Sequence, residues 1–156
     1  MFKGYAGGSW WNDPGAAAEY VCLPPDPDLV SRSYPSYYAT MYGVEYDEAT
    51  YSHDNGDDLP CAVCRSTKGT SVLMIPGKYS CYDGWTMQYH GNLVAGAHTF
   101  HSATQFICLD INPQAVLSGS RDDDGKLFYP VFATCGALAC PPYHDGKTLT
   151  CSVCSK

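Results

Sequence analysis

Three features are scarce or missing in this chain of 156 residues: long apolar runs, basic side chains and the short motifs of common enzymes. No apolar segment is long enough to span a membrane. Nine Lys and Arg against 16 Asp and Glu give a net charge of −7. This charge argues against nucleic acid and anionic membrane surfaces as partners, because both require a basic footprint.

Enzyme motifs are also missing. The chain contains no Gly-x-Ser-x-Gly, no His-Glu-x-x-His and no phosphate loop, so we do not expect an enzyme. Short motifs cannot detect the carboxylate pair of a glycoside hydrolase, because its two acids can come from any part of a fold. A glycoside hydrolase is therefore the alternative that stays open.

Cysteine, by contrast, is abundant. Nine Cys in a chain of this length predict disulfides formed in an oxidising compartment, and therefore a secreted protein. Residues 1–3 are followed by Gly and Tyr and not by the apolar core of a signal peptide. We therefore expect this to be the mature form, from which the signal peptide has been removed.

The sequence repeats itself. Three landmarks recur in the same order: 19–27 with 105–113, 41–46 with 128–133, and 59–64 with 149–154. The last pair shares the motif Cys-x-Val-Cys. We interpret the chain as one domain, 1–156, built of two pseudo-symmetric halves at about 4–66 and 90–156 that are joined by a bridge at 67–89.

Short apolar runs bounded by Gly, Pro, Asn or Asp predict strands, and none has the length of a helix. These runs are 21–23, 72–75, 106–109, 127–129 and 148–150. Residues 15–19 and 102–105 favour short helical turns. Tight turns are predicted at Asn55-Gly56, Asp83-Gly84, Asp124-Gly125 and Asp145-Gly146. The expected fold is β-rich, either all-β or α+β with short helical turns.

Equivalent cysteines in the two halves should pair equivalently. The alternatives are Cys22 with Cys61 or Cys64, and Cys108 with Cys151 or Cys154. An odd number of cysteines leaves one thiol over, which predicts a disulfide-linked homodimer. A zinc site made of both Cys-x-Val-Cys pairs is less favoured, because their separation far exceeds the usual spacing of zinc ribbons.

Several segments together resemble a known module: 7–9, 20–24, 59–65, 72–77, 81–86, 140–143 and 151–154. They are similar to the C-terminal noncollagenous domain of the short-chain collagen-like proteins of sea anemones, molluscs and sponges. The chain lacks the Gly-X-Y tract of the collagen-bearing members. In its free-standing form the module resembles sea-anemone lectins that bind galactose and require calcium. The resemblance therefore implies calcium as a cofactor and galactose-terminated, lactose-type glycans as partners.

A galactose site needs an aromatic ring for the C–H face of the sugar and fixed polar groups for its hydroxyls. Trp85 is the first candidate, because Gln88 and His90 lie close to it in sequence. Trp10, Trp11 and His53 are further candidates. The alternative for each Trp is a place in the core, since one indole buries about 150–250 Å².

Calcium requires hard oxygen ligands, usually carboxylates with carbonyls and water. The first candidate is an acidic loop whose ligands would be Glu45, Asp47, Asp54, Asn55, Asp57 and Asp58, with Glu48 beside them. The second half has only 144–147 at the corresponding place, so the extra acids are local to the first half. A second candidate is 121–125, with acids at 122–124. Neither has the spacing of an EF-hand, and solvated turns are the alternative for both.

The cysteine content predicts secretion, and the resemblance implies a calcium-dependent lectin that binds terminal galactose without covalent chemistry. The rival is an extracellular matrix domain that associates chains and binds no sugar.

Overall fold

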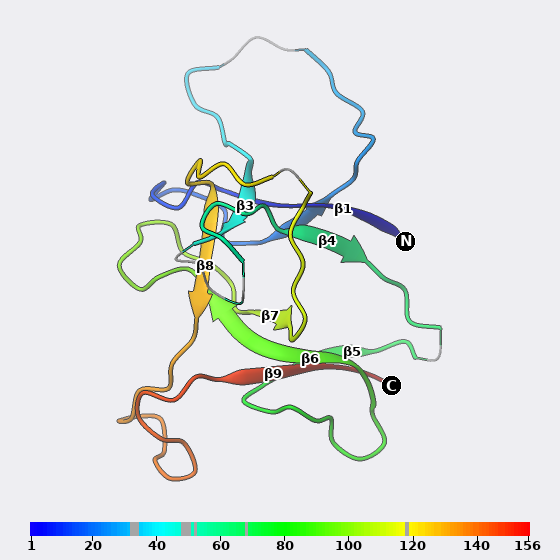
Figure 1. The fold of residues 1–156 in the computed structure, drawn as a ribbon, viewed down its shortest axis with the longest axis vertical. Coiled ribbons are helices and arrows are strands. Elements are labelled where there is room, and N and C mark those ends of the chain that lie inside the picture. Colours follow the sequence, from blue (N-terminus) through cyan, green and yellow to red (C-terminus); the bar gives the residue numbers. More distant parts are fainter. Residues whose placement is uncertain (32–34, 48–50, 52, 68, 118) are drawn as a thin grey trace. The chain divides into compact units, whose positions relative to one another are not determined.

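The computed structural model describes every residue except 32–34, 48–50, 52, 68 and 118. The described residues form strands and no helix (Figure 1), so the predicted β-rich fold is confirmed in its all-β form. The helical turns predicted at 15–19 and 102–105 are wrong. The N–H of Gln105 donates to the carbonyl of Ala18, so the two segments bond to each other and neither forms a helical turn. The described part of the chain also holds no helix with the length and apolarity needed to cross a membrane.

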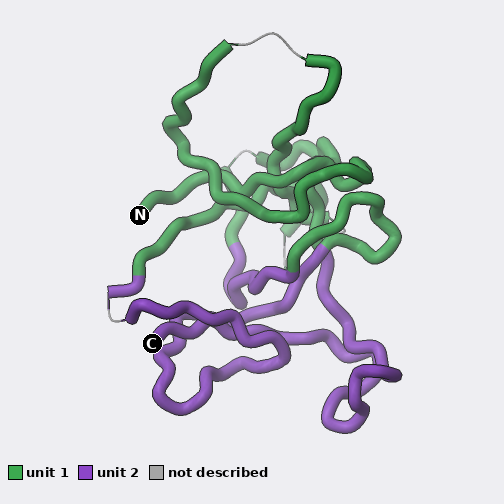
Figure 2. Tube along the Cα trace, turned by 180° about the vertical axis from the view of Figure 1, so that it is seen from behind, with its two compact units in different colours: residues 1–65, 96–105, 114–128 green, residues 66–95, 106–113, 129–156 purple. Residues whose placement is uncertain are grey.

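The chain divides into two compact units that interleave along the sequence (Figure 2). Unit 1 consists of Met1–Arg65, Gly96–Gln105 and Gln114–Phe128, and unit 2 of Ser66–Ala95, Phe106–Pro113 and Tyr129–Lys156. The predicted bridge 67–89 lies within unit 2. Two parts of the predicted second half, 96–105 and 114–128, lie within unit 1.

Strand β1 (Phe2–Gly8) is the centre of unit 1. It pairs antiparallel with β2 (Val21–Leu23), β3 (Tyr42–Tyr46) and β4 (Pro60–Val63). β3 in turn pairs in parallel with the first residues of β8 (Lys126–Pro130). The buried apolar side chains of unit 1 are Ala6, Val44, Tyr46, Leu127 and Phe128.

Strand β6 (Thr86–Ala95) has the same place in unit 2. It pairs antiparallel with β7 (Ile107–Asp110), β9 (Thr150–Ser155) and the last residues of β8. β9 also pairs with β5 (Val72–Pro76), which has no counterpart among the strands of unit 1. The buried apolar side chains of unit 2 are Ile75, Leu93, Val94, Leu109, Ala133, Cys151 and Cys154.

The central strands of the two units share their pairing registers. On β1, Gly4 faces Cys61 and Ala6 faces Cys22. On β6, Gly91 faces Cys151 and Leu93 faces Cys108. The third neighbouring strand, β3 in unit 1 and β8 in unit 2, pairs at the corresponding position, with Gly7 facing Gly43 and Val94 facing Pro130. Equivalent positions of the two central strands therefore face their neighbours in the same register.

One disulfide in each unit joins two strands that flank the central strand. Cys22–Cys61 links β2 to β4, and Cys108–Cys151 links β7 to β9. The Cα atoms of each pair are 5.7 Å apart. In a flat sheet two strands separated by a third lie about 9.5 Å apart. The flanking strands therefore curl over one face of the central strand. Each bond is one of the two pairings predicted for its half.

A glycine of the central strand faces one cysteine of each of these disulfides. A Cβ on Gly4 would collide with the carbonyl oxygen of Leu23, and a Cβ on Gly91 would collide with that of Leu109. Since any other residue carries a Cβ, the curled sheet has room only for glycine at these two positions.

The other cysteines distinguish the two units. Unit 2 contains Cys81–Cys154 and Cys135–Cys140. Cys64 is the free cysteine, and it is exposed. Cys64 and Cys154 are the second cysteines of the two Cys-x-Val-Cys motifs. The same position of the motif is therefore bonded within unit 2 and free in unit 1.

We expect Gly4→Ala and Gly91→Ala each to lower the free energy of unfolding by about 1–3 kcal/mol, because the added methyl group forces the curled strands apart. Gly43→Ala is the matched control, since a Cβ at this strand position meets no atom within 4 Å. Denaturant unfolding of the oxidised proteins measures the difference. Three variants of equal stability would contradict the close approach at Gly4 and Gly91.

Candidate functional site

The two acidic segments that the sequence offers as alternative calcium sites lie against each other in unit 1. The side-chain amide of Asn55 donates to Oδ2 of Asp122 at 2.7 Å. Gly56, at φ +83°, packs so closely on Asp122 that a Cβ would lie 2.6 Å from its backbone nitrogen. The residues of both candidates therefore lie in one region of unit 1.

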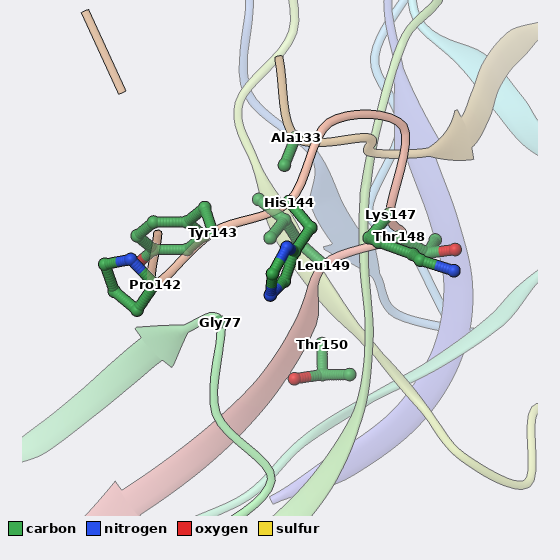
Figure 3. A pocket seen from close by; sticks show the side chains of 9 residues that line it. All are labelled: Gly77, Ala133, Pro142, Tyr143, His144, Lys147, Thr148, Leu149 and Thr150. Carbon is green, nitrogen blue, oxygen red and sulfur yellow. The ribbon is translucent and has the colours of Figure 1, made fainter. Parts of the chain in front are cut away.

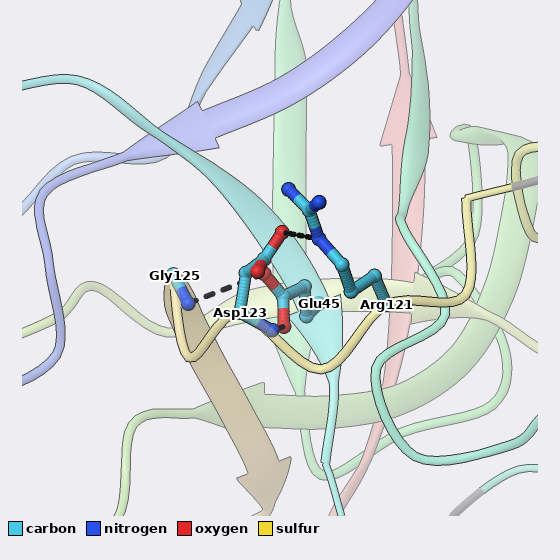
Figure 4. Close-up of polar contacts among 4 residues, drawn as sticks. All are labelled: Glu45, Arg121, Asp123 and Gly125. Carbon is cyan, nitrogen blue, oxygen red and sulfur yellow. Dashed lines mark hydrogen bonds and ion pairs between the residues drawn. The ribbon is translucent and has the colours of Figure 1, made fainter.

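Glu45 is the centre of this site. β3 is buried on both faces, so Glu45 is only 4% exposed between Val44 and Tyr46. Its Oε2 accepts the N–H of Asp123 at 3.1 Å, and its Oε1 accepts the N–H of Gly125 at 3.2 Å (Figure 4). The carboxylate thus fixes the segment 121–125 by two charge-assisted hydrogen bonds.

Two more carboxylates lie near Glu45. Asp58 faces it across an isolated β-bridge, and Asp58 and Asp123 line a hollow of about 360 Å³ together with Gly119, Ser120 and Arg121. Arg121 donates from Nε to Oδ2 of Asp123 at 2.7 Å (Figure 4). One guanidinium against three carboxylates leaves an excess of negative charge. We call Glu45, Asp58 and Asp123 the acidic cluster.

The pKa values of the acidic cluster report this crowding. Burial raises the pKa of Glu45 above its ordinary value, and the charges of Asp58 and Asp123 raise it further, against the hydrogen bonds from the backbone, which lower it. Burial also raises the pKa of Asp58, with the charges of Asp123 and Asp57 acting in the same direction and Arg121 opposing them. A bound cation would offset both the cost of burying these carboxylates in their charged form and the repulsion between them.

The other candidate ligands of the first loop lie outside the acidic cluster and have contacts of their own. Oδ2 of Asp57 accepts the N–H of Asp54 at 3.2 Å and lies 3.5 Å from Nδ1 of His53. The ring of His53 stacks on Tyr46 at 4.3 Å. Asp54 is exposed and Asp47 half-buried at the end of β3, while Glu48 lies outside the described residues. Within the described residues no three His, Cys, Asp or Glu side chains converge as a ready-made metal site.

Trp10 and Trp11 lie beside the same segment. The N–H of Trp11 donates to the carbonyl of Gly125 at 3.1 Å, next to the glycine N–H that Glu45 holds. The ring of Trp11 lies 5.6 Å from Trp10 and 4.6 Å from Phe100. Its indole N–H is buried and has no hydrogen-bond partner among the described residues. Segment 121–125 therefore connects the acidic cluster to a row of aromatic rings.

Trp85, Gln88 and His90 belong to unit 2 and have different surroundings. Trp85 is half-buried in a turn closed by its N–H and the carbonyl of Tyr82. Gln88 is the extra residue of a bulge in β6, and it donates to Oγ of Ser155 at 2.9 Å. The ring of His90 lies edge-on to Tyr79. The closeness of these residues in sequence does not make them a cluster of contacting side chains.

Lys126 is a residue that the sequence analysis missed. It is fully buried, and its Nζ donates to Oγ of Ser102 at 3.1 Å and to the carbonyl of Ala103 at 3.3 Å. Burial lowers its pKa, against the charge of Glu19. The ammonium also lies 5.6 Å from the ring of Tyr20. Lys126 thus fixes residues 102 and 103, which follow Phe100 of the aromatic row in sequence. A lone lysine at the start of an apolar run carries no sequence signal for this role.

The chain was compared with protein-family models, with curated proteins and with solved structures, and no match was found in any of the three.

The pKa shifts predict that the protein loses stability as the pH rises when calcium is absent. In the window between the ordinary carboxyl pKa and the raised folded values of Glu45 and Asp58, the folded protein holds protons that the unfolded chain has released. Below this window the buried carboxyls are protonated and cost no stability. Above it they are ionised, and the full cost of their burial lowers the free energy of unfolding.

Asp58→Asn should therefore be more stable than the unaltered protein at neutral pH in EDTA, and the difference should vanish in acid. Thermal midpoints across the pH range measure this. Asp83→Asn, in an exposed turn of unit 2, is the control and should change little. A neutral-pH midpoint of Asp58→Asn below that of the unaltered protein would refute the assignment.

Proposed function

We propose that this chain is a secreted, calcium-dependent lectin for terminal galactose, and that its site lies in unit 1. The observation that carries the proposal is the double role of segment 121–125. Its backbone N–H groups are held by Glu45, and its last carbonyl is held by Trp11. A cation site and an aromatic platform for a sugar thereby share one short segment.

The acidic cluster suits calcium in its chemistry. Its donors are carboxylate oxygens, supplemented by carbonyls of the 119–123 segment, and Ca²⁺ prefers such hard ligands. Asp58 and Asp123 line the hollow and would hold the ion, with Glu45 behind them. Bound calcium would supply open coordination positions for sugar hydroxyls. The chain itself contributes the charge that holds the ion and the fixed segment that orients it.

The aromatic row suits the other face of a galactoside. The axial 4-hydroxyl of galactose leaves one continuous C–H face, which packs well on an indole ring. Trp10 is half-exposed at the end of the row, whereas Trp11 lies between Trp10 and Phe100. Trp10 therefore replaces Trp85 as the preferred platform.

A disulfide-linked homodimer is the proposed assembly. In unit 2, β5 pairs with β9 and Cys81 bonds to Cys154. In the described part of unit 1, β4 pairs with β1 alone, and the corresponding Cys64 is free and exposed. An open strand edge that ends in an exposed thiol favours pairing with the same edge of a second copy. Four disulfides also support secretion, because such bonds persist in oxidising compartments.

The rival function is a matrix domain that associates chains and binds no sugar. The open edge of β4 and the thiol of Cys64 favour it as much as they favour a dimeric lectin. Only sugar binding separates the two.

We expect the protein to be retained on immobilised lactose with calcium and released by EDTA.

Asp58→Asn and Asp123→Asn should each lower calcium affinity roughly tenfold or more, because affinity follows the charge of the ligands. Trp10→Ala should lower lactose affinity about tenfold at an unchanged thermal midpoint. Asp83→Asn and Trp85→Ala are the matched controls in unit 2. Titration calorimetry measures both affinities. Loss of lactose binding in Trp85→Ala, with Trp10→Ala unaffected, would move the platform to unit 2.

On non-reducing gels the protein should migrate near twice its mass of 17.0 kDa, and reductant should convert it to one band at the monomer position. Cys64→Ser should be monomeric without reductant. The double variant Cys135→Ser/Cys140→Ser removes a disulfide within unit 2 and should stay dimeric. A monomer with one titratable thiol would argue against the dimer and leave the lectin proposal to the lactose experiment.

A further inference from the structure

In unit 1 the end of β3 bonds to the turn at 54–58, and we call this part of the backbone the corner. It has a structural counterpart in unit 2. In unit 1 the N–H of Tyr46 donates to the carbonyl of Asp57, and the N–H of Gly56 donates to the carbonyl of Tyr46. In unit 2 Ala133, Lys147 and Gly146 make the same two bonds in the same order. The isolated β-bridges correspond too, Glu45 with Asp58 and Phe132 with Thr148. The two corners therefore share one backbone arrangement.

The side chains at this shared corner differ in charge. Glu45 and Asp58 correspond to Phe132 and Thr148, and Asp57 corresponds to Lys147. Counting back from the turn glycines Gly56 and Gly146, Asp54 corresponds to His144. Acidic positions of unit 1 are thus apolar, hydroxyl-bearing or basic in unit 2. Asn55 corresponds by the same count to Asp145, whose carboxylate accepts the N–H of Cys135 at 2.8 Å. The unit 2 corner therefore lacks the excess of carboxylates of unit 1, and Lys147 is its cationic side chain for an anionic group.

A hollow of about 300 Å³ opens at this corner of unit 2 (Figure 3). Its volume is that of the smaller sites for organic ligands. The side chains that line it include one aromatic ring, one imidazole, one ammonium and two hydroxyls, from Tyr143, His144, Lys147, Thr148 and Thr150.

The walls of this hollow are fixed by covalent and hydrogen bonds. The disulfide Cys135–Cys140 closes the loop that leads to Tyr143, and the N–H of Tyr143 donates to the carbonyl of Ala139. Gly77, at φ +82°, lies under Tyr143, whose hydroxyl would be 3.4 Å from a Cβ at that position. The carboxylate of Asp145 is held by the N–H of Cys135 at 2.8 Å. The hollow is therefore formed before a ligand arrives, which reduces the cost of binding.

We propose that this hollow binds a carboxylate-bearing monosaccharide unit, such as a uronic acid residue of a glycan, without calcium. Lys147 receives the carboxylate, with His144 beside it, and the ring of Tyr143 packs against the C–H face of the sugar. Thr148 and Thr150 bond to ring hydroxyls. The proposal rests on the proposed function only for the class of ligand, since no residue of the unit 1 site takes part. One chain then carries a calcium-dependent site for neutral galactosides and a calcium-independent site for acidic saccharides.

The test is a titration of the full-length protein in EDTA with methyl glucuronide, followed by the NMR shifts of backbone amides. Residues 143–150 should shift, and methyl glucoside, which lacks the carboxylate, should bind roughly tenfold more weakly. Lys147→Met should lower glucuronide affinity by about the same factor, and Tyr143→Ala should lower it at an unchanged fold. Lys78→Met, a lysine of unit 2 that lies over the ring of Tyr82, is the matched control and should bind normally.

Equal affinity for glucuronide and glucoside would overturn the proposal, as would normal glucuronide binding by Lys147→Met. Shifts confined to unit 1 residues would do the same. The outcome is separable from that of the lectin proposal, because Asp58→Asn should leave glucuronide binding in EDTA intact. Conversely, Lys147→Met should leave calcium-dependent lactose binding intact.

Discussion

The fold of each unit depends on one close approach, in which a disulfide draws two strands together over a glycine of the strand between them. The Cα atoms of Cys22 and Cys61 lie as near each other as those of directly neighbouring strands, although β1 separates β2 from β4. Gly4 gives the carbonyl of Leu23 the space that a side chain would take. The apolar core of each unit is small, and a disulfide closing a loop of 39 or 43 residues contributes about 3–4 kcal/mol in the chain-entropy account. The disulfides that cross these glycines therefore supply stability that the small apolar core of each unit does not provide.

The two units share a backbone arrangement at one point and differ in the side chains that it presents. The curled sheet fixes the register of β3 in unit 1 and of the segment after β8 in unit 2, and so places the same corner at the same point of each unit. The corner side chains are then free to differ, because the backbone bonds of Tyr46 and Ala133 hold it without them. In unit 1 the corner concentrates carboxylates whose pKa values are raised, and in unit 2 it presents a lysine and an aromatic ring.

Part of this structure was predictable from the sequence. Apolar runs identified β2, β5, β7 and β8, and the repeat limited the disulfide partners of Cys22 and Cys108 to two each. β1 and β6, the central strands, were missed. β1 contains three glycines and therefore shows no strand pattern, and its strand conformation follows from pairing with its neighbours. β6 alternates Gln88, His90 and Asn92 with Tyr89, Gly91 and Leu93, which is a strand pattern that the sequence analysis overlooked.

The candidate site was predictable in its residue types and not in its assembly. Acidic loops and tryptophans flanked by polar residues are visible in the sequence, but the parallel pairing of β3 with β8 joins residues about 80 positions apart. That pairing brings the two calcium candidates together. Trp11 bonds to Gly125 of the acidic segment in unit 1, whereas Trp85 lies in unit 2.

The central claim is that calcium and galactose share one site in unit 1, and linkage tests it most directly. Calcium affinity should be measured by titration calorimetry without lactose and with saturating lactose, and lactose affinity without and with saturating calcium. The account predicts that each ligand strengthens the binding of the other by the same factor. Calcium binding that is unchanged by saturating lactose would contradict it.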